Sequence, residues 1–139
     1  MNKENEKIAI GILAYNVSKY IDNVLDELQD FNLHIYVIND SSIDGTEKKL
    51  EKYKEKSNVT VITNSKNLGA GFSLKKLIKA SYENGYTFLI KVDGDGQFKK
   101  EDVKKIINLY KENDYEYIRC NRFWSQGIEG DIPKKRLFG

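Results

Sequence analysis

The 139-residue sequence predicts an α/β fold, a three-layer sandwich in which a mostly parallel, doubly wound sheet carries helices on both faces. Two observations support this prediction. Short apolar runs of strand length alternate along the chain with longer segments whose apolar residues recur every three or four positions. Three of the runs also end in polar clusters, AYN, NDSS and DGDGQ, and sheets of this kind bind ligands beyond the carboxyl ends of their strands.

Three strands and two helices are expected in the first half of the chain. The strands are the apolar runs IAIGIL and HIYVI and the alternating run NVTVIT, which is typical of a position nearer a sheet edge: residues 8–13, 34–38 and 58–63. The first helix is expected to have Ser18 as its cap, because apolar residues recur at helical spacing from Ile21 onward. A lysine-rich second helix, capped by Asp44 or Thr46, is expected to end at about Lys56.

Two helices and two strands are expected in the second half. Asn67 begins a glycine-containing turn that opens a helix through Tyr82, and Gly85 ends this helix. The run FLIKV is expected to form the central strand of the sheet. Acidic side chains at Glu101 and Asp102 favour the first turn of the next helix, because they interact well with its dipole. The segment YEYIRC, residues 115–120, predicts a fifth strand, and a basic loop follows it.

The stretch TFLIKVDGDGQF, residues 87–98, carries the main chemical signal. Its apolar run ends in Asp93 and Asp95, and each of them is followed by a glycine. Because unpaired charge inside a buried strand costs several kcal/mol, both carboxylates are expected where the strand meets solvent. There they can jointly hold Mg²⁺ or Mn²⁺, which accepts one or two carboxylates and completes its shell with water and substrate phosphates. Gly94 and Gly96 let the backbone bend and let a ligand come close.

Several other sites do not fit the sequence. An EF-hand calcium loop needs glycine where Phe98 stands and glutamate where Lys104 stands. A dinucleotide fingerprint fails because Leu74 replaces its third glycine, and no P-loop GKS or GKT is present. The only histidine, His34, lies inside an expected strand and is interpreted as structural. No Ser/His/Asp or Cys/His arrangement can therefore be assembled, which argues against a covalent nucleophile.

Each candidate residue also has a plainer interpretation. Acidic pairs fill turns and cap helices, Asp40 lies in the turn-rich NDSSIDGT, and the glycines of NLGAG can be an ordinary turn before a helix. Tyr15 can simply pack. The basic residues near the end of the chain, Arg122 and residues 134–136, can be a solvated tail, or Arg136 can pair with phosphate.

The composition indicates one soluble domain in a reducing compartment. The chain is long enough to bury roughly two thirds of its unfolded surface. A single Cys120 cannot form an internal disulfide, and a formal charge of +2 gives no basic footprint for nucleic acid. No apolar run approaches the ~18 residues that span a bilayer. We therefore expect a cytoplasmic polypeptide, and the ending KKRLFG, which closes no element, indicates a fragment of a longer chain.

Four motifs in order resemble a known family. AYN, INDSSIDGT, NLGAG and VDGDGQF cover nearly the whole chain and resemble the family 2 glycosyltransferases of the GT-A fold. The DGDGQ form is similar to the motif of the polyprenyl (dolichol) phosphate sugar transferases. Leu13, Val17 and Asn39 depart from the proline, glutamate and aspartate that are common in the family. These departures leave the identity of the nucleotide base open.

The resemblance implies roles for individual residues. It implies that the nucleotide is bound by Ala14, Tyr15, Ile38, Asp40, Asp93 and Gly94. Asp93 and Asp95 would hold the Mg²⁺ or Mn²⁺ and the donor diphosphate, with Gln97 beside them. Arg122 and Arg136 would contact phosphates, so the implied catalytic residues are Asp95, Gln97, Arg122 and Arg136.

The implied reaction is an inverting, metal-assisted transfer of a sugar from a UDP- or GDP-linked donor to a polyprenyl phosphate or a glycan hydroxyl, as in the synthesis of cell-envelope polysaccharides. Residues 1–139 would be the nucleotide-sugar-binding part of the GT-A domain, truncated at its C-terminus. The missing part could bring the full-length protein to the cytoplasmic face of a membrane, and a homodimer is left open.

Three other classes stay open beside this one. A sugar-nucleotidyltransferase should carry a glycine-rich, arginine-containing loop after its first strand, which AYNVSKY does not offer. A response-regulator receiver needs a lysine at the end of strand five, where Asn121 and Arg122 stand. A non-catalytic module that binds a nucleotide sugar is the third alternative.

Overall fold

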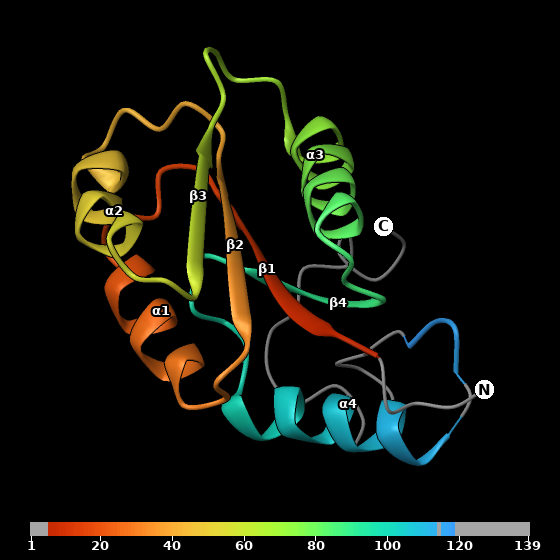
Figure 1. Ribbon diagram of the computed structural model, residues 1–139. Coiled ribbons are helices and arrows are strands. Elements are labelled where there is room, and N and C mark those ends of the chain that lie inside the picture. Colours follow the sequence, from red (N-terminus) through yellow and green to blue (C-terminus); the bar gives the residue numbers. More distant parts are fainter. Residues whose placement is uncertain (1–5, 114, 119–139) are drawn as a thin grey trace, which may run out of the picture.

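The structure, a computed structural model, describes residues 6–113 and 115–118 and has the expected α/β architecture (Figure 1). The strands are β1 (Ile8–Ala14), β2 (His34–Asn39), β3 (Val59–Thr63) and β4 (Phe88–Asp93). The helices are α1 (Ile21–Gln29), α2 (Thr46–Lys54), α3 (Ala70–Glu83) and α4 (Lys100–Glu112). The strands and helices expected before residue 113 are therefore confirmed, with bounds that differ by a few residues.

The described strands form one parallel sheet in the order β3-β2-β1-β4. The chain adds β2 and β3 on one side of β1 and then crosses to the other side, where β4 pairs with β1. In the register of the sheet, Asn39 pairs with both Ala14 and Thr63, and Asp93 pairs with Leu13. The polar ends of these strands consequently meet at one edge, next to the point where the strand order reverses.

Helices cover both faces of the sheet. On one face α3 places Leu77 against Ala9, Tyr36 and Ile38, and all four side chains are buried. The helices α1, α2 and α4 pack on the other face, which holds the larger part of the core. The first face requires a glycine at position 11, because a Cβ atom there would lie only 2.4 Å from Cδ2 of Leu77.

Three predictions about local structure need correction. Ser18 does not cap α1; its backbone N–H donates to Asp44, and Tyr20 precedes the helix without a side-chain cap. Within the sheet of the described residues, β4 lies at the end and not at the predicted central position, and Lys91 within it is exposed. Residues 115–118 are not in a strand; their alternating pattern leaves both tyrosines exposed, and the rest of the expected fifth strand lies outside the described residues.

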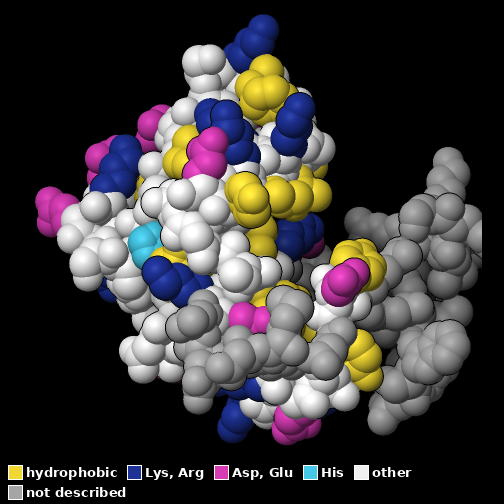
Figure 2. Space-filling model, turned by 45° about the vertical axis from the view of Figure 1, so that its right-hand side comes forward, with side chains coloured by type: hydrophobic (Ala, Val, Ile, Leu, Met, Phe, Trp, Pro, Cys, Tyr) yellow, Lys and Arg dark blue, Asp and Glu magenta, His cyan; other side chains and the backbone are white. Residues whose placement is uncertain are grey.

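The surface mixes charges of both signs. On the face shown in Figure 2, Lys side chains lie among Asp and Glu side chains, with exposed hydrophobic side chains between them. The helix α3 contributes Phe72, Ile78 and Tyr82 to the exposed hydrophobic residues. Among the described residues, no helix has the length and the apolar character that a membrane crossing requires.

Candidate ligand-binding site

A pocket of about 310 Å³ opens at the carboxyl edge of the sheet. Its walls come from the ends of β1, β2 and β4 and from the start of α3. The lining residues are Leu13, Ala14, Tyr15, Val17, Asp40, Asn67, Gly69, Ala70, Ser73, Lys91, Asp93, Gly94 and Asp95. Since the strand order reverses between β1 and β4, the pocket lies where open α/β sheets bind their ligands.

The structure brings most of the residues proposed from the sequence to this pocket. Its lining includes Ala14, Tyr15, Asp40, Asp93, Gly94 and Asp95. Ile38 is instead fully buried in the cluster under α3 and does not line the pocket. Gln97 is exposed just outside the lining, and its backbone N–H donates to Oδ1 of Asp95 at 3.1 Å. Arg122 and Arg136 lie outside the described residues.

Asp40 is a buried carboxylate at the end of β2 that holds the loop before α3. Its Oδ1 atom accepts hydrogen bonds from Nδ2 of Asn64 at 2.7 Å and from the N–H of Leu68 at 2.9 Å, and Oδ2 accepts one from the N–H of Gly69 at 2.8 Å. Burial alone would raise the pKa of Asp40, but these hydrogen bonds outweigh it and lower the pKa below its usual value. The pocket wall therefore carries a fixed negative charge at neutral pH.

Asn64 connects Asp40 to α3 and is a residue that the sequence interpretation missed. It is only 2% exposed, and besides Asp40 its Nδ2 atom donates to Oγ of Ser73 at 3.1 Å. Its Oδ1 atom accepts from Nζ of Lys76 at 2.8 Å. A buried amide with these partners fixes the start of α3 relative to the end of β2. The sequence could have indicated Asn64, because it directly follows the third strand and the other site residues also follow or end strands.

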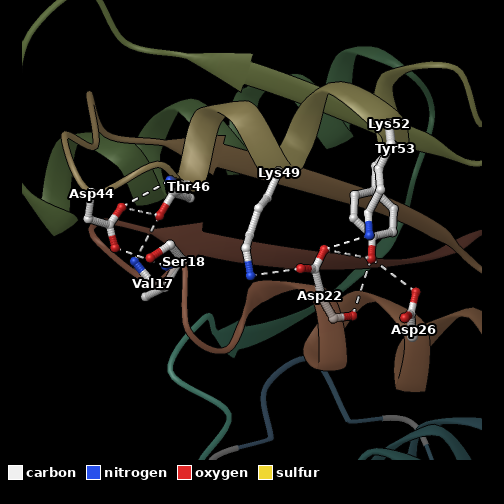
Figure 3. A network of polar contacts seen from close by, with 9 residues as sticks. All are labelled: Val17, Ser18, Asp22, Asp26, Asp44, Thr46, Lys49, Lys52 and Tyr53. Atoms are coloured by element: carbon white, nitrogen blue, oxygen red, sulfur yellow. Dashed lines mark hydrogen bonds and ion pairs between the residues drawn. The ribbon is translucent and has the colours of Figure 1, made fainter.

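The loop that carries Tyr15 is fastened to the loop after β2 by Asp44 (Figure 3). Asp44 accepts hydrogen bonds from the N–H of Ser18 at 2.9 Å and from the N–H and hydroxyl of Thr46 at 3.0 and 2.6 Å. The Thr46 hydroxyl in turn accepts from the N–H of Val17 at 3.0 Å. Asp44 therefore holds the neighbouring loop and the first residue of α2, but neither Asp44 nor Thr46 is the predicted helix cap, because Gly45 occupies the cap position without a side-chain hydrogen bond. These hydrogen bonds hold the pKa of Asp44 well below its usual value, against the upward effect of burial.

Gly94 brings the acidic pair against the end of β1. Its N–H donates to the carbonyl oxygen of Leu13 at 3.2 Å. A Cβ atom at this position would lie 3.0 Å from that oxygen and 3.2 Å from Cγ2 of Val17. These distances are shorter than ordinary contacts, so any larger residue would push its neighbours aside by a few tenths of an ångström. The residues on either side, Asp93 and Asp95, are exposed and partly exposed, as expected for charges at the end of a strand.

The acidic pair fits a hard divalent cation. Carboxylate oxygens are the ligands that Mg²⁺ and Mn²⁺ prefer, and two of them suffice when substrate phosphates and water complete the shell. Among the described residues, no three or more His, Cys, Asp or Glu side chains gather into a fuller set of ligands. A cation here would therefore need oxygen atoms from its substrate.

Lys91 is a further lining residue that the sequence interpretation missed. Its ammonium group forms an ion pair with Oδ1 of Asp93. Residues two apart in a strand lie on the same face. The presence of Lys91 within an apolar run, two positions before Asp93, could therefore have predicted that both side chains reach the pocket.

Comparisons with known proteins agree with this architecture. The family described as "Glycosyl transferase family 2" matches residues 9–138. The chain is 31% identical over 146 residues to the UDP-N-acetylglucosamine--dolichyl-phosphate N-acetylglucosaminyltransferase of Methanococcus voltae, covering 95% of this chain and 58% of that protein. It is 28% identical to the dolichyl-phosphate beta-glucosyltransferase of Dictyostelium discoideum, covering 96% of this chain and 41% of that protein.

A solved structure shows the same likeness in three dimensions. Residues 1–349 of S. aureus TarS in complex with UDP superpose with a TM-score of 0.63 at 27% identity, covering 76% of this chain and 32% of that one. The chain spans about half the length of the curated relatives that it matches, between 41% and 58% for the two named here.

Proposed function

The chain belongs to glycosyl transferase family 2, and from this premise we propose that its pocket binds a nucleotide-diphosphate sugar together with Mg²⁺ or Mn²⁺. The whole protein would transfer the sugar to a polyprenyl phosphate or to a glycan hydroxyl. One observation carries the proposal: Asp40, Asp93 and Asp95, which follow or end two separate strands, line one pocket at the reversal of strand order. Relatives named for dolichyl phosphate and a similar structure that holds UDP support it.

The nucleoside would lie at the end of the pocket formed by Tyr15 and Asp40. The side chain of Tyr15 is 48% exposed and can pack against a base or ribose. Asp40 lines the same part of the pocket and carries a negative charge, so it can accept a hydrogen bond from a hydroxyl group of the ligand. A volume of about 310 Å³ lies at the lower end of the range for small-molecule sites.

The diphosphate would lie at the acidic end, where Asp93 and Asp95 hold the cation. A bound cation supplies neutralisation of the charge that develops on the departing nucleoside diphosphate. The close approach of the backbone at Gly94 keeps both carboxylates at the pocket. We propose direct attack by the acceptor on the sugar, with inversion and no covalent enzyme intermediate, because the cation would engage Asp93 and Asp95, the carboxylates at this end of the pocket that could otherwise act as nucleophiles.

The acceptor determines how much further help the reaction needs. A lipid phosphate is already an anion and requires little general-base catalysis, whereas a hydroxyl group normally requires a carboxylate. We propose that Gln97, Arg122 and Arg136 contact phosphates, because an amide can donate to phosphate oxygen and a guanidinium group matches its geometry. Residues 1–139 would then form the donor-binding part of the domain.

A thermal-shift screen tests the proposal. The chain is titrated with UDP, GDP and their sugar conjugates, each with Mn²⁺, with Mg²⁺ and with EDTA. We expect one nucleoside diphosphate to raise the melting temperature only when a divalent cation is present, since ligands that bind the folded state stabilise it. ATP with Mn²⁺ serves as a control for non-specific binding. A melting temperature that no nucleoside diphosphate changes would contradict the proposal.

A non-catalytic nucleotide-sugar-binding module is a second candidate. The described residues that line the pocket all fall between positions 13 and 95, a stretch that could bind a donor without turning it over. The rate of donor hydrolysis with and without Mn²⁺ distinguishes the two candidates. Cleavage of the bound donor that depends on Mn²⁺ would exclude the second candidate.

A further inference from the structure

We propose that Lys91 is a diphosphate-binding residue whose ammonium group pairs with Asp93 and competes there with the divalent cation. The inference rests on the proposed function, because it adds a contact for the same donor. Neither the acidic motif nor the nucleotide-binding residues inferred from the sequence include this lysine.

The position of Lys91 in β4 directs it to the pocket. Its neighbours Ile90 and Val92 are buried on the face of the sheet that α1, α2 and α4 cover. Lys91 and Asp93 alternate with them and belong to the opposite face, where Leu89 packs in the cluster under α3. Both Lys91 and Asp93 line the pocket, and the ammonium group is bonded to Oδ1 of Asp93.

The ion pair is of a kind that exchanges partners easily. The side chains of Lys91 and Asp93 are 41% and 58% exposed, and exposed ion pairs contribute little to stability. A divalent cation held by Asp93 and Asp95 together binds the Asp93 carboxylate more strongly than the ammonium group does, since it carries twice the charge and contacts two carboxylates. The cation therefore displaces the ammonium group from Asp93.

The displaced ammonium group remains at the acidic end of the pocket. Lysine carries a compact charge with three N–H donors on a flexible stem, so rotation of its side chain is enough to change partners. A nucleoside diphosphate brings several negative oxygen atoms to this end, and hydrogen bonds from a charged donor to phosphate are among the stronger ones. Lys91 thus exchanges Asp93 for the diphosphate when cation and donor bind.

The substitution Lys91→Met removes the charge and keeps an unbranched apolar side chain. Mn²⁺ binding is measured by electron paramagnetic resonance without nucleotide, and binding of UDP, GDP and their monophosphates by calorimetry at saturating Mn²⁺. We expect Mn²⁺ alone to bind several-fold more tightly, because its competitor is gone. The nucleoside diphosphate should bind roughly tenfold more weakly, a difference of about 1.4 kcal/mol, and the monophosphate should be affected less. Lys91→Arg should restore most of the diphosphate affinity.

A matched control is Lys54→Met. Lys54 forms an ion pair with Glu51 at 2.6 Å, with side chains 38% and 58% exposed, and it lies outside the pocket. This variant should leave both affinities unchanged. The inference about Lys91 would be overturned if Lys91→Met left the diphosphate affinity unchanged or affected diphosphate and monophosphate equally. It would also be overturned if Mn²⁺ did not bind more tightly, or if Lys54→Met caused the same changes. None of these results would contradict the proposed function. If the unmodified chain binds neither UDP nor GDP with Mn²⁺, the proposed function fails as well.

Discussion

At the residue scale, Asp95 is the carboxylate whose chemistry can be changed with the least effect on the fold. Its side chain is partly exposed, and Oδ1 accepts a hydrogen bond from the N–H of Gln97 at 3.1 Å. Asparagine has the same shape and keeps an oxygen that can accept this bond, but it carries no charge. The Asp95→Asn substitution should therefore weaken the binding of a cation without disturbing the local turn.

We predict that Asp95→Asn abolishes Mn²⁺-dependent nucleotide binding and leaves the thermal unfolding midpoint nearly unchanged. Calorimetry with UDP or GDP and Mn²⁺ measures the first effect, and circular dichroism measures the second. Asp102→Asn is the control, because Asp102 is an exposed aspartate in the first turn of α4, outside the pocket. Unchanged nucleotide binding in Asp95→Asn would count against the metal site.

Asp40 combines a structural role with the proposed binding role. In Asp40→Ala the N–H of Leu68 loses its acceptor, whereas Nδ2 of Asn64 keeps Ser73 and the N–H of Gly69 keeps Asn67. Since a buried donor without an acceptor costs about 1–3 kcal/mol and two further hydrogen bonds to a charged group are lost, we predict a loss of about 3 kcal/mol in the free energy of unfolding. Nucleotide binding should be lost as well.

Urea denaturation followed by circular dichroism measures the effect of Asp40→Ala on stability. Asn67→Ala is the control, because the exposed Asn67 accepts a single hydrogen bond in the same loop, from the N–H of Gly69 at 3.1 Å. Its stability should change by less than about 1 kcal/mol. A similar small change in Asp40→Ala would show that the buried carboxylate does not organise the loop.

At the scale of elements, the contact between β1 and α3 depends on the missing side chain of Gly11. A Cβ atom there would lie 2.4 and 2.7 Å from the two Cδ atoms of Leu77, which is fully buried. Overpacking of a core by extra atoms typically costs 1–3 kcal/mol. Because the start of α3 also lines the pocket, a displaced helix would disturb the site as well.

We predict that Gly11→Ala lowers the free energy of unfolding by about 2 kcal/mol. The same substitution in a Leu77→Ala background should cost much less, because the smaller side chain leaves space for the new methyl group. A double-mutant cycle by urea denaturation measures this coupling. Equal costs in both backgrounds would mean that Leu77 is not the obstacle.

At the scale of the whole molecule, the lowered pKa values of Asp40 and Asp44 at the site, like that of Asp22, link stability to pH. In the folded state hydrogen bonds lower the pKa of Asp40 and of Asp44 below the usual value of 3.8. Between the unfolded and folded pKa values the unfolded chain binds more protons than the folded chain. Their contribution to stability is therefore fully present above about pH 4 and is lost as the pH falls through the folded pKa values.

We predict that the free energy of unfolding falls as the pH is lowered from about 4 to 2, and that Asp44→Asn reduces this fall. The variant should be less stable than the original chain at pH 7, and the difference should shrink as the solution becomes acidic. Urea denaturation across this range measures both effects. A difference that does not depend on pH would show that the charge of Asp44 does not stabilise the two loops.

Hydrophobic periodicity in the sequence was sufficient to predict the eight described strands and helices and the layered architecture. It also identified Asp40, Asp93 and Asp95, because polar residues that follow buried strands must lie at the carboxyl edge of a parallel sheet. These features depend on residues that are neighbours in the sequence. The roles of Gln97, Arg122 and Arg136 stay predictions.

Only the tertiary structure decided which of these neighbourhoods meet. It placed β4 at the end of the described sheet, buried Ile38 under α3, and brought Asn64 to Asp40 and Lys91 to the acidic end of the pocket. It also made Asp44 a link between two loops, where local spacing had predicted Ser18 as a separate helix cap. The physical reason is that the spacing of apolar residues along a helix or strand indicates only which face of that element is buried. The residues that pack against this face come from a distant part of the chain, so the local sequence does not identify them.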